Sequence, residues 1–255
     1  MSAHRRDFLH LVAGSVAAAA IVAPAVKAQA PGPGKVRAIA FDGFPIIDPR
    51  PVFAKSEEMF PGKGAELSNA WRTRQFEYTW LRTMSGSYVD FWQVTEQALV
   101  FAAKLTKIEL PGAQRDELMA SYLGLKAWPD ALAALKKLRD AGIRMAFLSN
   151  FTAEMLDAAI RNSGLQGIFE AHLSTDRVKA FKPDPRAYQM GVDAFGMAKD
   201  QIAFAAFAGW DAAGAKTFGY PTFWVNRANA PLEELGAVPD GIGAGLQDLV
   251  AFAGA

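Results

Sequence analysis

The chain has 255 residues, with 27 basic and 26 acidic side chains, so its net charge is close to zero. This length allows one large domain or a domain with an insertion, and the absence of a basic block gives no sign of a nucleic-acid partner. Cysteine is absent, which excludes disulfides, thiolate metal sites and a cysteine nucleophile. Two of the three histidines lie near the N-terminus, so the chemistry must rest mainly on carboxylates, Lys, Arg and hydroxyl groups.

Residues 1–30 have the features of an export signal. Arg5 and Arg6 precede an apolar stretch over residues 11–22, and Ala28-Gln29-Ala30 is a small-x-small cleavage site. The segment resembles a bacterial twin-arginine signal peptide, which implies the twin-arginine export machinery as a partner and a periplasmic protein. An uncleaved anchor is the alternative, but the apolar stretch is shorter than the ~20 residues of a membrane span. We expect no stable span after cleavage, and residues 31–35 are predicted to be a linker.

The apolar run over residues 36–41 predicts a buried strand, and it ends abruptly in Asp42 and Gly43. In an open parallel sheet, ligands bind at the carboxyl ends of the strands. A carboxylate at that edge can act as a nucleophile, a base or a metal ligand. The alternative is a simple turn, because Asp-Gly between apolar runs is also a hairpin signal.

The stretch from 48 to 126 shows helical periodicity and no convincing strand. Helices are predicted over residues 65–84, 88–105 and 114–124. The stretch is rich in large aromatic side chains, most of which should pack as helix core.

Beyond Trp128, helices and strands alternate. Helices are predicted over 129–140, 153–163, 185–195, 212–218 and 246–252, and strands over 143–148, 170–174, 202–207 and 222–225. This alternation predicts an α/β fold, a doubly wound parallel sheet covered on both faces. The first strand should belong to the same sheet. Residues 36–47 and 127–255 would then form the core domain, and residues 48–126 an inserted helical cap.

Polar groups follow four of the predicted elements: Asp42, Ser149-Asn150, Lys182 and Asp211. In a doubly wound sheet these positions can converge on one crevice. Each has a structural alternative when taken alone. Ser149-Asn150 and Asp211 could cap helices, and Lys182 could belong to a rigid turn. Their order and spacing together are much more specific.

These four positions resemble the four motifs of the haloacid dehalogenase superfamily: a strand-end Asp, a strand-end Ser or Thr, a Lys and an acidic loop. Longer segments resemble the L-2-haloacid dehalogenases within it, and they cover essentially the whole chain after the leader. The matching segments are 71–82, 88–92, 148–150, 181–188, 210–216 and 218–227. The resemblance implies a Rossmann-like core with a helical cap. Because that family is often dimeric through its cap helices, a homodimer is one arrangement open to this chain.

The resemblance also implies a mechanism. Asp42 would attack C2 of an L-2-haloalkanoate, expel halide and form an ester with inverted carbon. Water would then attack the Asp42 carbonyl carbon and release a D-2-hydroxy acid. A small 2-halo carboxylic acid is the implied substrate, and no cofactor or metal is implied.

Roles for the other matching residues follow from the resemblance. Lys182 would keep Asp42 ionised, because a nearby cation lowers the pKa of a carboxylate. Arg72 would reach in from the cap toward the leaving halide, and Asp211 would hold Lys182 and assist the water. The implied substrate-binding residues are Ser149 and Asn150, which would hold the carboxylate, and Tyr188, Phe44, Phe91 and Trp210, which would shape a dry pocket.

The chain departs from the family's pattern at several polar positions. Phe44 stands where superfamily phosphatases have a second Asp that acts as general acid, which disfavours phosphate-ester hydrolysis. Ile46, Ala206 and Ala208 stand where the dehalogenases have Thr, Ser and Asn. Two hypotheses remain open: a dehalogenase with a drier, altered site, or a relative that binds a small carboxylate or is alkylated once and stalls. A hydrolase of another small substrate is a third and weaker reading.

Overall fold

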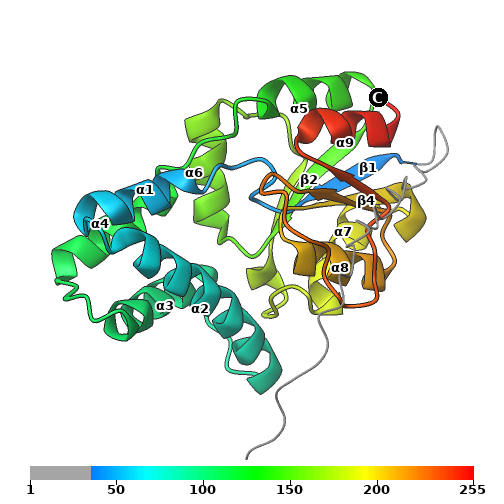
Figure 1. The fold of residues 1–255 in the computed structure, drawn as a ribbon. Helices are drawn as coiled ribbons and strands as arrows, with labels where there is room; N and C mark the ends of the chain where they lie inside the picture. The colour runs from blue at the N-terminus through cyan, green and yellow to red at the C-terminus, as the bar shows by residue number, and fades with distance from the viewer. Residues whose placement is uncertain (1–35) are drawn as a thin grey trace, which may run out of the picture.

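A computed structural model describes residues 36–255 (Figure 1), and the predicted leader and linker lie outside this range. Six parallel strands form one sheet in the order β3-β2-β1-β4-β5-β6. The strands are β1 (Ala38–Phe41), β2 (Arg144–Ser149), β3 (Ala171–Ser174), β4 (Ile202–Ala206), β5 (Thr222–Val225) and β6 (Gly241–Gly243). The predicted parallel sheet is confirmed, and β1 lies near its centre.

Alternate residues of the strands face opposite layers of helices, as strand geometry requires. Ile39 and Phe41 belong to the cluster that includes α5 (Ala131–Asp140), α6 (Ala153–Ser163) and α9 (Leu246–Ala253). Ala38 and Ala40 belong to the cluster of α7 (Pro185–Phe195) and α8 (Gly209–Phe218). In Figure 1, α5 and α9 lie above the sheet and α7 and α8 below it. A sheet buried on both faces accounts for the nearly continuous apolar strands.

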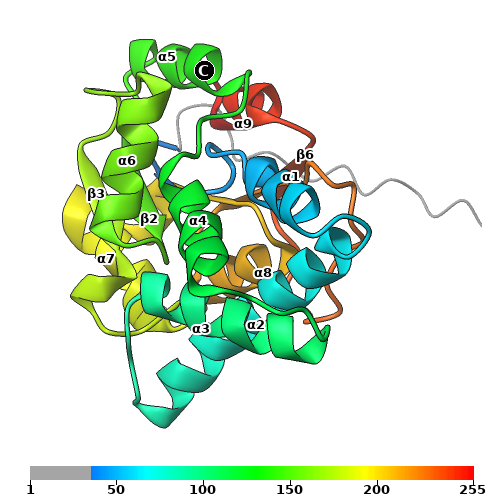
Figure 2. The same ribbon diagram turned by 90° about the vertical axis from the view of Figure 1, so that its left-hand side faces the viewer.

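Four helices separate β1 from α5: α1 (Arg50–Met59), α2 (Gly64–Ser85), α3 (Phe91–Leu105) and α4 (Gly112–Leu123). They form a lobe beside the carboxyl edge of the sheet (Figures 1 and 2). The two chain connections to this lobe run side by side, because Ile47 and Ala127 form an antiparallel bridge. The bridge lies at the boundaries predicted for the cap.

The main differences from the predicted elements concern helix ends and short strands. Helix α3 begins at Phe91 rather than at residue 88, because the Asp90 carboxylate caps it by accepting a hydrogen bond from Gln93 N–H. Helix α8 begins at Gly209 rather than at residue 212. Helix α1 and strand β6 are not among the predicted elements; β6 has only three residues, two of them glycines.

Within residues 36–255, no helix combines the length and apolar character that a membrane crossing requires.

Helix α8 has no side-chain cap, because its N-cap residue is Ala208, with φ −93° and ψ 144°. This extended conformation is the one in which Asn or Ser would accept a hydrogen bond from the first turn. We predict that Ala208→Asn raises the free energy of unfolding by about 1 kcal/mol, measured by urea denaturation. Ala54→Asn, on the exposed side of α1, is the control and should lower stability slightly. A loss of stability in Ala208→Asn would contradict the prediction.

Candidate active site

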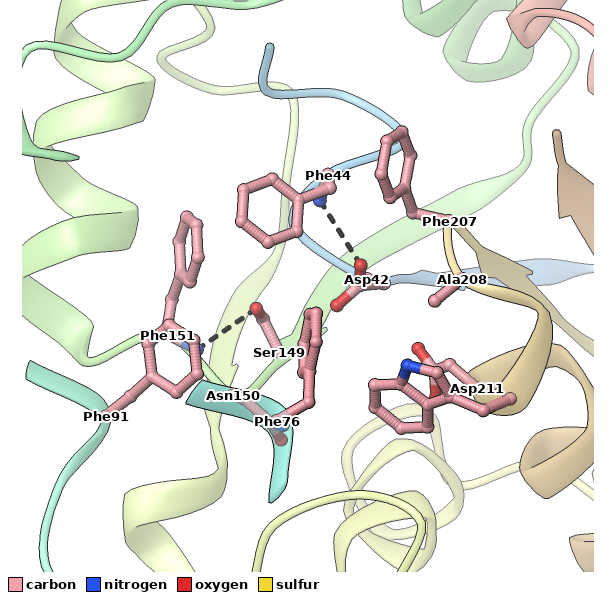
Figure 3. Close-up of a pocket in the computed structure, with 11 residues that line it drawn as sticks. Asp42, Phe44, Phe76, Phe91, Ser149, Asn150, Phe151, Phe207, Ala208 and Asp211 are labelled. Atoms are coloured by element: carbon pink, nitrogen blue, oxygen red, sulfur yellow. Dashed lines mark hydrogen bonds between the residues drawn. The ribbon is translucent and has the colours of Figure 1, made fainter. Parts of the chain in front are cut away.

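The strand order reverses direction between β1 and β4, which makes this point of the carboxyl edge a natural ligand crevice. Asp42 follows β1, and Asp211 lies in the first turn of α8, which follows β4. Ser149 ends the neighbouring strand β2, and Asn150 follows it. Figure 3 shows these side chains around one small cavity. The structure therefore brings together polar groups that lie far apart in the sequence.

Lys182 joins two carboxylates at the base of this site. Its Nζ donates to Asp42 Oδ1 at 2.7 Å and to Asp211 Oδ2 at 2.6 Å. Lys182 is almost fully buried, and its backbone N–H donates to Asn150 Oδ1 at 3.1 Å. The second Asp42 oxygen, Oδ2, accepts a hydrogen bond from Phe44 N–H at 3.3 Å. The Asp42 carboxylate is thus held by donors from two segments of the chain.

Burial and charge act against each other in this cluster. Burial alone would lower the pKa of Lys182, but the charges of Asp211 and Asp42 outweigh it and raise that pKa. Burial raises the pKa of Asp211 from 3.8 to about 6, although Lys182 opposes the shift. Protonation of Asp211 therefore favours the folded state, and this contribution to stability is lost as the pH rises from 3.8 to about 6.

Tyr188, which the resemblance implies as a residue that shapes the substrate pocket, lies behind Asp211 and is not in the lining of the cavity. Its ring is fully buried between α7 and α8, and its hydroxyl donates to Asp211 Oδ1 at 2.7 Å. Burial, with the nearby Asp211 charge, raises the pKa of the Tyr188 hydroxyl well above its usual value. Tyr188 is therefore a neutral donor that orients Asp211 from behind the site.

The cavity beside Asp42 is small and mostly apolar. Its volume is about 20 Å³, which is room for about one water. The lining includes seven predicted site residues: Asp42, Phe44, Phe91, Ser149, Asn150, Trp210 and Asp211. Trp210 also contacts the rings of Phe76 and Trp80 from α2, so the cap closes over the core at this point.

Arg72, which the resemblance places near the leaving halide, lies outside the small cavity beside Asp42. It lines a separate chamber of about 400 Å³ on the other side of an aromatic wall. The residues shared by the cavity and the chamber form that wall: Phe44, Phe76, Phe207 and Ala208. The Arg72 side chain is exposed and has no ion pair or hydrogen bond within residues 36–255.

The three apolar departures from the family's pattern occupy different places. Ile46 and Ala206 are fully buried, and neither lines the cavity. Ala208 does line it, between the end of β4 and the first turn of α8. Among the described residues, only one of the three replacements therefore changes the wall of the cavity itself.

Three phenylalanines were not predicted as site residues but line the cavity: Phe76, Phe151 and Phe207. Each lies in or beside a segment that resembles the family or adjoins one of its motifs, so proximity to the motifs was the available signal. In residues 36–255, no cluster of three or more His, Asp or Glu side chains could hold a metal ion.

Comparisons with known proteins identify the family to which this site belongs. The profile of the haloacid dehalogenase-like hydrolases matches residues 19–219. Haloacetate dehalogenase H-2 of Moraxella sp. is 40% identical over 207 residues, which are 81% of this chain and 92% of the relative. The chain belongs to the haloacid dehalogenase-like hydrolases.

Within this family, the curated relatives include (S)-2-haloacid dehalogenases. The enzyme of Pseudomonas sp. strain YL is 38% identical over 80% of this chain and 89% of its own length. Among solved structures, an L-2-haloacid dehalogenase from Xanthobacter autotrophicus with covalently bound chloropropionic acid has a TM-score of 0.76 and 30% identity. That match covers 85% of this chain and 97% of the other.

Lys182→Met removes the cation that lies between the carboxylates of Asp42 and Asp211, and Asp211 is almost fully buried. We predict that it lowers the free energy of unfolding by about 3–5 kcal/mol at neutral pH, measured by urea denaturation. The control is Lys216→Met, which breaks the more exposed ion pair with Asp240 and should cost at most about 1 kcal/mol. Equal losses in the two variants would contradict the account of Lys182.

The raised pKa of Asp211 predicts an acidic limb in the turnover rate with a midpoint near pH 6. Tyr188→Phe removes a donor that stabilises the Asp211 carboxylate, so the limb should move to higher pH. Tyr220→Phe is the control, because its hydroxyl donates to the Tyr188 carbonyl and does not touch Asp211. The measurement is the rate of halide release between pH 4 and 9, roughly the range in which carboxylates and histidine titrate. If the acidic limb of Tyr188→Phe has the same midpoint pH as that of the unmodified protein, Tyr188 does not set the pKa of Asp211.

Proposed function

We propose that this protein hydrolyses L-2-haloalkanoic acids to D-2-hydroxy acids through an ester of Asp42. The observation that carries the proposal is the Asp42 carboxylate, held by Lys182 at 2.7 Å and facing a small apolar cavity at the carboxyl edge of β1. A carboxylate with few water neighbours is a stronger nucleophile than a fully hydrated one. The activities named for the curated relatives support the same reaction.

In the first step, an Asp42 oxygen forms a bond to C2 while the carbon–halogen bond breaks and the halide leaves with the electron pair. In the second step, water adds to the Asp42 carbonyl carbon and gives one proton to Asp211. The bond from that carbon to the substrate oxygen then breaks, and this oxygen takes the proton from Asp211 as the hydroxy acid leaves. The Asp42 carboxyl group releases the second water proton to solvent and is again ionised. Asp211 lines the cavity, and its pKa of about 6 leaves it mostly ionised at neutral pH. It is therefore the base on this chain that we assign to the water step.

The test is halide release from L-2-chloropropionate by residues 31–255, followed well beyond one equivalent per enzyme. The proposal predicts continued release, and Asp42→Asn should abolish it while leaving the fold intact. Retained release in Asp42→Asn would exclude this nucleophile.

A second candidate is a relative that is alkylated at Asp42 and not regenerated. The observation that favours it is Ala208, which lines the cavity where the family has Asn and supplies no polar side chain to place a water. Release that stops at one equivalent, with the substrate's carbon skeleton still attached to Asp42, would establish this candidate.

We also propose export by the twin-arginine route, with removal of residues 1–30 and a periplasmic location. The support is the sequence of the leader: Arg5-Arg6, the apolar stretch and the small-x-small site. Replacing both arginines by lysine should retain the full-length protein in the cytoplasmic fraction of a bacterial host. Unchanged periplasmic recovery would refute this route.

A further inference from the structure

The chamber behind the aromatic wall is much larger than the cavity beside Asp42, at about 400 Å³ against about 20 Å³. The space beside Asp42 holds about one water, which is less than any 2-halo acid needs, so a bound substrate extends past the shared wall and a large group on C2 needs the chamber. The two spaces share Phe44, Phe76, Phe207 and Ala208 in their walls, so a substituent on C2 has one direct route into the larger volume.

The lining of the chamber is mostly apolar. Seven of its residues are aromatic, and they come from α1, α2 and α4 of the cap, from β5 and from loops of the core. No Asp or Glu lines it, and two of its three arginines are already paired, Arg50 with Asp48 and Arg227 with Asp130. The third, Arg72, is the one unpaired charge among the described residues of the lining. Away from Arg72, such walls favour an apolar group over a charged one.

The base of the chamber is held in place by its own contacts. Trp128 Nε1 donates to the Phe44 carbonyl at 2.9 Å, and the Trp128 ring lies between the guanidinium groups of Arg50 and Arg227, at 4.4 and 4.5 Å. Arg227 also donates to the Pro45 carbonyl. The loop that follows Asp42 is therefore fixed on the chamber side, and the chamber is preformed rather than a gap between loose side chains.

The wall contains one small residue, Ala208. It places a single methyl group between the two spaces where the family has Asn. The rest of the wall consists of the rings of Phe44, Phe76 and Phe207. The Phe44 and Phe207 centroids lie 5.7 Å apart at a 49° tilt. Passage of a substituent requires these rings to change rotamer.

We infer that this chamber receives the C2 substituent of the substrate, so that the protein acts on 2-halo acids with a large apolar substituent, aryl or long alkyl. This inference rests on the proposed function. It also accounts for a small apolar residue at position 208, because a larger polar side chain there would thicken the wall and hinder the passage of an apolar substituent.

The experiment compares halide release from the L enantiomers of 2-bromopropionate, 2-bromohexanoate and 2-bromo-2-phenylacetate by the mature chain. Each added methylene buried in the chamber should raise kcat/KM about fourfold, so 2-bromohexanoate should exceed 2-bromopropionate at least about tenfold. Ala230→Trp fills the mouth of the chamber from a position that does not line the Asp42 cavity. It should lower kcat/KM for the two large acids at least about tenfold and leave 2-bromopropionate within about twofold.

The matched control is Leu232→Trp, which adds the same ring to the same loop at an exposed position outside the chamber. It should leave all three substrates unchanged. Phe53→Trp fills the chamber from α1 and serves as the second variant if Ala230→Trp fails to fold.

Turnover of 2-bromopropionate without turnover of the large acids overturns the inference and leaves the proposed function standing. Equal losses on all substrates in a folded filling variant also overturn it. Absence of turnover on every substrate overturns the proposed function and this inference together.

Discussion

A single buried cation shared by two carboxylates is the interaction on which the site depends. Lys182 comes from the loop before α7, Asp42 from the end of β1 and Asp211 from the first turn of α8. Burying an ion pair is costly, so these groups persist only with complete hydrogen bonding. Asn150 and Tyr188 add to this hydrogen bonding: Asn150 Oδ1 accepts from the Lys182 backbone N–H, and the Tyr188 hydroxyl donates to Asp211 from behind the site. The same contacts that stabilise the buried charges therefore also aim Asp42 at the cavity.

Much of this arrangement follows from the sequence. The apolar run before Asp42 and the alternation after Trp128 predict the parallel sheet, and the sheet brings the strand-end groups together. Side-chain direction was harder to predict. The resemblance implies that Tyr188 shapes the pocket, and in the structure its hydroxyl lies behind Asp211. The resemblance places Arg72 near the leaving halide, and in the structure Phe44, Phe76 and Phe207 lie between the small cavity and the chamber that Arg72 lines. Such outcomes depend on packing between distant segments, which spacing does not encode.

The positions of the apolar departures from the family's pattern also explain their effects. Ile46 and Ala206 are core positions, where an apolar side chain fits a fully buried environment. Ala208 is different, because it is at once the N-cap of α8, part of the cavity and part of the wall toward the chamber. One substitution thus links helix stability, the polarity around Asp42 and the space open to a substrate. Family membership alone does not reveal this link.

The central claim is that Asp42 forms a covalent ester that water cleaves at the carboxyl carbon. A single turnover in heavy-oxygen water, with enzyme in excess over L-2-chloropropionate, tests it most directly. The account predicts that mass spectrometry finds the label in the peptide that carries Asp42 and not in the hydroxy acid, because the product's new oxygen comes from the carboxylate. Label found in the product and absent from that peptide would show that water attacks the substrate itself, and would contradict the account.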